Sequence, residues 1–264
     1  MSERVTLVTG ASAGIGTELA RVFAANGHRL ALVARREDRL VALARELAAK
    51  GGLAKNVAAP IVIPCDLAAS DGADRIAAAL AEAGVEVEYL VNNAGFGLFG
   101  KAVQLDRAEQ LDMIAVNIRS LTDLSLRFAD QLIKNRGGIL NLGSVAGFLP
   151  GPGMAVYYAS KAYVISFSEA LRKELAPQGV RVTVLCPGPV PSEFQTRAGF
   201  KPGIDSAILN VSPAAVAAAG YRGLMADKRV VLPGLGIKIV PFMLRWFPRG
   251  FILDAVGRLQ LRRS

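Results

Sequence analysis

The 264-residue chain is poor in the side chains that most often perform redox or metal chemistry. It has two cysteines and one histidine. Cys65 and Cys186 stand at the ends of apolar runs, so we expect small buried side chains in a reducing compartment rather than a disulfide framework. His28 precedes a predicted strand, far from the other polar motifs, which excludes Ser-His-Asp chemistry. We see no ligand spacing for a metal ion.

Long apolar runs are also missing. The most apolar stretch, Val230–Phe247, is interrupted by Lys238 and Arg245, so no segment is predicted to span a bilayer. The N-terminus begins with a strand-like run, and we expect no signal peptide there and a cytoplasmic location.

Acidic residues are scarce towards the C-terminus. Residues 221–264 contain nine basic and only two acidic side chains, whereas the rest of the chain is close to neutral. This basic region, mixed with Leu, Phe and Trp, has two interpretations: contact with an anionic membrane surface or acidic ligand, or a solvated helix face. The neutral remainder indicates no nucleic-acid binding.

Short apolar runs alternate with helical patterns along the chain. Because the runs are continuously apolar, they are typical of parallel strands buried on both faces. The pattern predicts an α/β fold with a doubly wound sheet, helices on both faces, and one domain over residues 1–264. The predicted strands are Val5–Thr9, Arg29–Ala34, Val57–Pro64, Val87–Val91, Gly138–Gly143 and Val180–Leu185; the predicted helices are Ile15–Asn26, Glu37–Lys50, Asp71–Ala83, Asp106–Asn135 and Met154–Pro177.

A glycine-rich turn joins the first predicted strand to the first helix. Gly10 permits the sharp turn, Gly14 lets the backbone approach a phosphate, and Gly16 allows close packing of helix on strand. With Ile15, these residues open a helix whose N-terminal N–H groups would face a pyrophosphate. The context strand–turn–helix predicts a dinucleotide site.

Basic residues follow the second predicted strand, where an NAD site usually has a carboxylate. Arg35 and Arg36 would bind a 2′-phosphate that a carboxylate would repel, and Ser12 is expected to add a hydroxyl. The sequence therefore predicts NADP(H) in preference to NAD(H). An open alternative is that both arginines merely begin the next helix in solvent.

Polar residues also follow the third and fourth strands. Asp66, with Leu67 after it, is expected to accept a hydrogen bond from an adenine amino group. Asn93, Ala94 and Gly95 are predicted to line the cofactor. Asn92 has two roles that the sequence leaves equally open: lining the cofactor or tying backbone groups together.

The candidate reacting centre is a tyrosine and a lysine four residues apart in a predicted helix. Tyr157 and Lys161 would share one helix face. A nearby ammonium, together with the charged ring of an oxidised nicotinamide, is expected to lower the pKa of the Tyr157 phenol and suit it to proton transfer. Tyr158 is a rival, because its spacing to Lys161 also places the two on one face.

Two further polar residues support this centre. Ser144 follows the fifth strand and is predicted to stabilise the substrate oxygen. Asn117 lies within a helical pattern, where its side chain is expected to hold a water behind Lys161; alternatively it bends or caps the helix.

In this order, these motifs resemble the short-chain dehydrogenase/reductase family over residues 4–195. They are Thr9-Gly10-x3-Gly14-x-Gly16, Asn92-Asn93-Ala94-Gly95, Asn117, Ser144, Tyr157-x3-Lys161 and Pro187-Gly188. The resemblance implies a Rossmann-like fold, an NAD(P) cofactor, a homo-dimer or homo-tetramer, and an Asn–Ser–Tyr–Lys catalytic group. It assigns Tyr157 as acid/base, Ser144 to the substrate oxygen, Lys161 to the ribose and Asn117 to the relay water.

The resemblance also implies that Val190 and Ser192 meet the nicotinamide carboxamide, although Pro189 and Pro191 stiffen this segment. It further implies a substrate flap at residues 193–211 and a branch containing 3-oxoacyl and carbonyl reductases. The C-terminal residues 235–264 are expected to form a helical extension.

The substrate is predicted to be a hydrophobic carbonyl compound, such as a 3-oxoacyl thioester. Apolar side chains flank the motifs, and they either line its pocket or belong to the core: Phe96, Phe148, Leu149, Met154 and Phe194. The alternative function is an NADP(H)-binding sensor or scaffold with little turnover.

Overall fold

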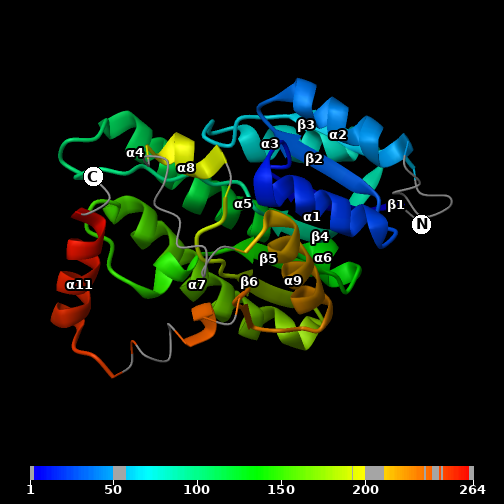
Figure 1. Cartoon of the computed structure of the whole chain (residues 1–264). Helices are drawn as coiled ribbons and strands as arrows, with labels where there is room; N and C mark the ends of the chain where they lie inside the picture. Colours follow the sequence, from blue (N-terminus) through cyan, green and yellow to red (C-terminus); the bar gives the residue numbers. More distant parts are fainter. Residues whose placement is uncertain are drawn as a thin grey trace.

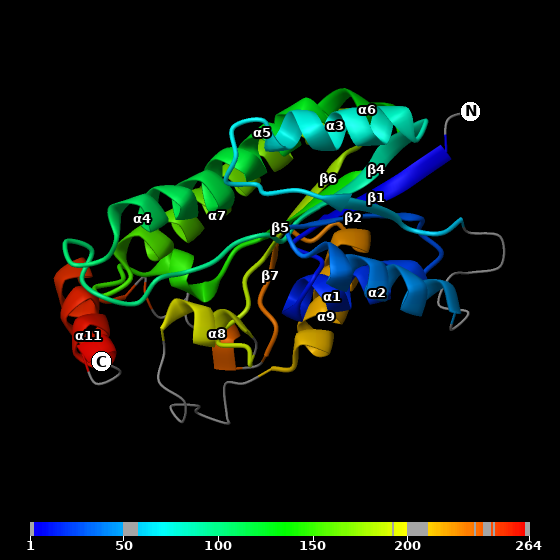
Figure 2. The same cartoon turned by 90° about the horizontal axis from the view of Figure 1, so that it is seen from above.

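The computed structural model describes residues 3–49, 58–191, 193–199, 211–234, 236–239, 244 and 246–261. Within them the chain forms a parallel sheet between two layers of helices (Figures 1 and 2). The predicted α/β fold is confirmed.

The sheet contains seven strands in the order β3-β2-β1-β4-β5-β6-β7, all paired in parallel. Its order reverses between β1 and β4, which is where a doubly wound sheet binds its ligand. The strands are β1 (Glu3–Thr9), β2 (Leu30–Ala34), β3 (Ile61–Pro64), β4 (Val85–Asn92), β5 (Gly138–Leu142), β6 (Arg181–Leu185) and β7 (Val230–Val231). The first six match the predicted strands to within a few residues; β7 was not predicted, because two residues give no readable period.

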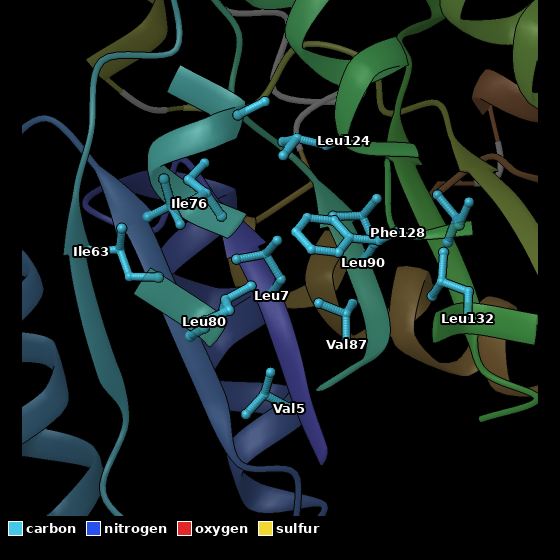
Figure 3. Close-up of a cluster of buried hydrophobic side chains, with 14 of the residues drawn as sticks. Val5, Leu7, Ile63, Ile76, Leu80, Val87, Leu90, Leu124, Phe128 and Leu132 are labelled. Carbon is cyan, nitrogen blue, oxygen red and sulfur yellow. The ribbon is translucent and has the colours of Figure 1, made fainter. Parts of the chain in front are cut away.

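Alternating side chains of each strand enter opposite helix layers. Val5 and Leu7 of β1 belong to one buried cluster and Val8 to the other. Figure 3 shows the first cluster, in which strand residues meet Ile76 and Leu132 from the covering helices. Because both faces are covered, the strands read as continuous apolar runs.

Among the described helices, three cover one face of the sheet and four cover the opposite face (Figure 2). The first group contains α1 (Gly14–Ala25), α2 (Glu37–Ala49) and α9 (Pro213–Met225); the second contains α3 (Gly72–Glu82), α5 (Leu121–Arg127), α6 (Ala129–Lys134) and α7 (Ala155–Leu175).

The predicted helix Asp106–Asn135 is not one continuous α-helix. It consists of α4 (Arg107–Ile114), a π-helical segment η1 (Ala115–Ser120), α5 and α6. Asp106 caps α4 by accepting from the Glu109 N–H at 2.8 Å. The break at η1 coincides with Asn117, a residue that competes for backbone hydrogen bonds inside a helix.

Several short helical segments connect or extend the elements described above. A 3-10 turn η2 (Val145–Phe148) follows β5, η3 (Ala176–Gln178) extends α7, and α8 (Glu193–Ala198) begins the predicted flap. The C-terminal extension contains η4 (Gly236–Ile239) and α11 (Arg249–Leu261), and α11 lies beside the N-terminal end of α7. No helix in the described residues is both long and apolar enough to cross a membrane.

Candidate functional site

The glycine-rich turn after β1 has the shape that a dinucleotide needs. Gly10 and Gly14 adopt positive φ angles of 67° and 55°, which glycine tolerates without strain. A Cβ atom on Gly16 would overlap the Gly10 carbonyl oxygen. Ala13 supplies no side-chain cap to α1, so the N–H groups of its first turn remain suited to a phosphate. Ile15 packs against the adjacent core.

A hydrogen-bond network joins the glycine turn to the end of β4. The Thr9 hydroxyl accepts from the Asn93 and Ala94 N–H groups at 3.0 and 3.1 Å, and donates to the Val91 carbonyl. The Asn93 amide donates to the Thr9 and Gly10 carbonyls at 2.9 and 3.2 Å. Asn93 therefore holds the turn in place rather than directing its side chain at the cofactor.

Asn92 contacts neighbouring side chains, rather than the backbone groups that the sequence suggested. Its side-chain amide donates to Asn141 Oδ1 at 2.9 Å and to Ser125 Oγ at 3.0 Å. The bonds connect β4 to β5 and α5, in the sheet interior, because Asn92 is buried.

The two arginines after β2 point to different partners. Arg35 approaches Asp66 at 4.0 Å, whereas Arg36 donates to Ser12 Oγ at 3.2 Å. Asp66 also accepts from the Ala68 N–H at 3.0 Å, while its carboxylate remains half exposed. Leu67, by contrast, is buried in the core. Arg36 and Ser12 are thus brought together at the position predicted for the 2′-phosphate.

Tyr157 and Ser144 meet at the carboxyl edge of the sheet. Ser144 follows β5, and its hydroxyl lies close enough to the Tyr157 hydroxyl to lower the pKa of that phenol. Lys161, one turn further along α7, lies 5.8 Å from the Tyr157 ring centroid and donates to the Leu142 carbonyl at 2.7 Å. Tyr158 instead accepts from the Gln260 side chain at 2.9 Å. The contact with Ser144 therefore distinguishes Tyr157 from its rival.

The pKa values of Tyr157 and Lys161 differ from those expected from the sequence. Burial raises the pKa of Tyr157 to about 12, and the hydrogen bond from Ser144 opposes the rise. Burial also lowers the pKa of Lys161 to about 8. Desolvation disfavours both charged forms, and without the charged nicotinamide it outweighs any lowering of the phenol's pKa by the ammonium.

Asn117 is tied to the loop that follows β4. Its amide nitrogen donates to the Phe96 carbonyl and to Ser160 Oγ, both at 3.0 Å, and its oxygen accepts from the Phe96 N–H at 3.1 Å. A Cβ atom on Gly95 would lie 3.0 Å from Asn117 Oδ1 and 3.5 Å from Lys161 Nζ, so both side chains border the space above Gly95. Asn117 lies within the π-helical segment; its contact with a water and its alternative role in bending or capping the helix stay predictions.

Apolar side chains close around Gly97, beside Tyr157. A Cβ atom there would meet Phe194 at 2.9 Å, Met154 at 3.1 Å and the Tyr157 ring at 3.2 Å. Phe194 also contacts the Tyr157 ring, with centroids 5.3 Å apart. Of the five apolar residues named from sequence, Phe148 packs instead against a core cluster behind η2.

The segment predicted to meet the nicotinamide is described only in part. The Pro187 carbonyl accepts from the Val145 N–H at 3.0 Å, which holds the segment beside η2 and, through it, Gly188. Val190 is buried against the core. Ser192 and residues 200–210 of the predicted flap lie outside the described residues.

Three residues were missed from sequence. Ser160 accepts from Asn117, and Arg39 and Glu193 form an ion pair near Arg36. Arg39 stands three residues after Arg36, on the same face of α2, and this spacing was the only available signal.

A family model described as short chain dehydrogenase matches residues 4–201. The chain belongs to this family. It is an oxidoreductase that acts on CH–OH and C=O groups, like its relatives.

Among the family's members, a sulfoacetaldehyde reductase of Chromohalobacter salexigens is 41% identical over 191 residues, covering 71% of this chain and 72% of that protein. A solved short-chain dehydrogenase from Sphingobium yanoikuyae, in complex with NADPH, superposes with a TM-score of 0.81 at 32% identity, covering 96% and 95% of the two chains. A solved 3-ketoacyl-(acyl-carrier-protein) reductase from Brucella melitensis, complexed with NADH, superposes with a TM-score of 0.75 at 27% identity, covering 88% of this chain and 96% of that chain.

Proposed function

We propose that this short-chain dehydrogenase uses NADP(H) to interconvert a hydrophobic ketone and a secondary alcohol, with Tyr157 as acid/base. The observation that carries the proposal is the meeting of Tyr157 with Ser144 directly after β5, one helical turn from Lys161. The glycine turn after β1 lies at the same edge of the sheet, linked to it through Asn93 and Gly95.

Each residue has a distinct part in the proposed reaction. Tyr157 gives its proton to the carbonyl oxygen during reduction, or takes one from the alcohol during oxidation. Ser144, whose hydroxyl acts on the pKa of Tyr157, stabilises the same oxygen. Lys161 holds the ribose hydroxyls, and Asn117 positions the loop at Phe96 and the relay water.

When bound, NADP(H) would carry the hydride and, in its oxidised form, a positive charge. That charge is the influence that offsets burial at Tyr157, whose pKa otherwise stands at about 12. With Lys161 ionised below its lowered pKa of about 8, both positive groups favour the phenolate near neutral pH.

Two observations support NADP(H) over NAD(H). Arg36 and Ser12 lie within 3.2 Å of each other after β1 and β2, and Asp66, the carboxylate that follows β3, is opposed by Arg35. Guanidinium groups favour a 2′-phosphate, and a solved relative contains NADPH, although another contains NADH. Gly10, Gly14 and Gly16 would hold the pyrophosphate.

The substrate class rests on the apolar contacts beside Tyr157. Phe194 and Met154 lie against Gly97 beside the Tyr157 ring, and Met154 and the neighbouring Phe96 are buried. Such walls favour a bulky apolar carbonyl compound, and the 3-oxoacyl class is represented among the solved relatives.

The second candidate function is that of an NADP(H)-binding sensor or scaffold, which would bind the cofactor but turn over little substrate. The close contact of Ser144 with Tyr157 favours the enzyme, because a sensor has no need of it. Binding of cofactor without oxidation across a broad panel of ketones would favour the sensor.

The test is NADPH oxidation measured over classes of ketones with matched tyrosine variants. Tyr157→Phe is expected to lower kcat/KM by roughly 100-fold or more, because the general acid is lost. Tyr158→Phe is the control, since its hydroxyl bonds Gln260, and is expected to keep kcat/KM within about threefold. Normal turnover by Tyr157→Phe would contradict the proposal.

We also propose two partners beyond the substrate. Exposed apolar side chains on α4 and α5, among them Leu111 and Leu126, support a homo-dimer or homo-tetramer. Exposed aromatic side chains of the basic C-terminal region support contact with an anionic membrane surface.

A further inference from the structure

One carboxylate lies between two arginines of α2. Glu193, the first residue of α8, contacts Arg36 at 2.8 Å and Arg39 at 2.5 Å. Arg36 also donates to Ser12 Oγ. The carboxylate comes from a segment more than 150 residues away in the sequence, so only tertiary structure brings it here.

These residues form an anion-binding cradle, defined here as Ser12, Arg36 and Arg39. Two guanidinium groups hold one carboxylate, and a hydroxyl bonded to Arg36 lies beside them, which is also the donor set that a nucleotide 2′-phosphate requires. The hydrogen bonds from Arg39 and Arg36 lower the pKa of Glu193, so its carboxylate stays charged at neutral pH. The cradle is therefore filled by a negative charge of the chain itself.

The residue after Glu193 reaches the other half of the site. Phe194 packs on the Tyr157 ring with centroids 5.3 Å apart. Further along α8, Arg197 lies over the Phe96 ring at 4.0 Å. Figures 1 and 2 place α8 between α4 and the side of the molecule formed by α1 and α2. This short helix therefore contacts both the arginines of α2 and the proposed acid/base.

We propose that Arg39 and Glu193 determine cofactor specificity: Arg39 completes the 2′-phosphate site, and Glu193 is an internal competitor that the phosphate displaces. The inference rests on the proposed NADP(H) function. Two anions cannot share the cradle, because they repel each other at contact distance. When the phosphate takes it, Glu193 leaves, and the start of α8 is released from Tyr157 together with Phe194.

The consequence is a link between the cofactor and the substrate pocket. A nucleotide with a 2′-phosphate removes the contact that holds Phe194 on Tyr157, whereas one without it leaves Glu193 in the cradle. The chain thus favours NADP(H) at two points, in binding and in access to Tyr157.

The experiment uses two adenine nucleotides that differ in the phosphate. 2′,5′-ADP and 5′-AMP are titrated calorimetrically into the full-length chain and its variants. Glu193→Gln is expected to tighten binding of 2′,5′-ADP about threefold, the size of an exposed ion-pair effect, and to leave 5′-AMP unchanged. Arg39→Gln is expected to weaken 2′,5′-ADP roughly tenfold and leave 5′-AMP unchanged.

Glu169→Gln is the matched control. Glu169 also contacts an arginine, Arg229 at 2.7 Å, and its replacement makes the same change in charge away from α2. This variant is expected to bind both nucleotides as the wild type does. Thermal unfolding of each variant checks that the fold is retained.

Different results overturn different claims. If the wild type prefers 2′,5′-ADP but Glu193→Gln binds it no more tightly, or gains equally for 5′-AMP, the competition by Glu193 is wrong. If Arg39→Gln binds 2′,5′-ADP normally, Arg39 does not belong to the phosphate site. If the wild type itself shows no preference for 2′,5′-ADP, the NADP(H) proposal fails.

Discussion

Tyr157 and Lys161 are both enclosed by protein, and enclosure moves their pKa values in opposite directions. The phenol is harder to ionise and the ammonium is easier to deprotonate. The charge on Lys161 is retained near neutral pH with the help of a carbonyl acceptor, Leu142. This residue pair therefore carries a cost in stability that solvent-exposed groups would not have.

The cost at Lys161 predicts a pH dependence of stability. Its pKa is 10.5 in the unfolded chain and about 8 in the folded one, so between these values the unfolded state binds more protons. Stability from this group therefore rises as pH increases from 7 to 10, by about 2 kcal/mol.

Urea unfolding at both pH values, for the wild type and Lys161→Met, measures the effect. The difference in unfolding free energy between the two proteins is expected to shift by this amount in favour of the wild type at pH 10. A difference that stays constant with pH would show that Lys161 is not desolvated.

Helix α1 and the π-helical segment η1 show how single elements set the site. The π-helical turn at Ala115–Ser120 contains Asn117, whose side chain secures the Phe96 backbone. At the other side, α1 starts so close to the turn after β1 that Gly16 has no room for a side chain. The glycine is therefore a packing requirement, as well as part of the phosphate site.

A single methyl group tests the packing at α1. Gly16→Ala would place a Cβ against the Gly10 carbonyl oxygen, so the backbone of the turn or of α1 would have to shift. The substitution is expected to destabilise the protein by about 3 kcal/mol. Gly250→Ala, in α11, meets nothing within 4 Å and should be neutral or slightly stabilising. Denaturant titrations of both variants measure this; equal stabilities would mean that α1 shifts freely.

On the scale of the whole molecule, exposed apolar side chains gather in two regions. One lies on α4 and α5, where Leu111 and Leu126 are 50% and 58% exposed. The other is the C-terminal aromatic patch, defined as Trp246, Phe247 and Phe251, in which Phe247 and Phe251 stack with centroids 5.4 Å apart. The two regions differ in charge, since the second belongs to the strongly basic part of the chain.

The α4–α5 region predicts self-association. Leu126→Asp would bury an unpaired carboxylate in a homo-oligomer interface, and is expected to weaken association roughly 100-fold or more. Val103→Asp, at a side chain 94% exposed in the loop before α4, is the control. Light scattering across a concentration series gives the mass; an unchanged oligomer in Leu126→Asp would place the interface elsewhere.

The C-terminal aromatic patch predicts binding to anionic vesicles. Aromatic side chains enter the headgroup region while the nearby arginines attract anionic lipid. Replacing both Trp246 and Phe251 by Ser is expected to lower co-sedimentation with phosphatidylserine vesicles roughly tenfold. Phosphatidylcholine vesicles should bind weakly, and salt should reduce the effect. Undiminished binding of the double variant would contradict the membrane contact.

The sequence by itself determined that the sheet is parallel and doubly wound, and which residues stand at its carboxyl edge. Apolar period, glycine turns and motif order are local properties, so β1 to β6 and the positions of Ser144, Tyr157 and Lys161 could be predicted from it. Local pattern was insufficient for Asp106–Asn135, because its break depends on hydrogen bonds from Asn117 to the distant Phe96 and Ser160.

Only the tertiary structure decided which groups meet and how strongly they are desolvated. The pKa values of Tyr157 and Lys161 are shifted because several elements bury the two side chains, and the spacing of residues in the sequence does not reveal that burial. The ion pairs of Glu193 with Arg36 and Arg39 connect the start of α8 to the start of α2. Electrostatic interactions and hydrogen bonds depend on the distance between groups in space, and the number of residues between two groups in the sequence does not give that distance.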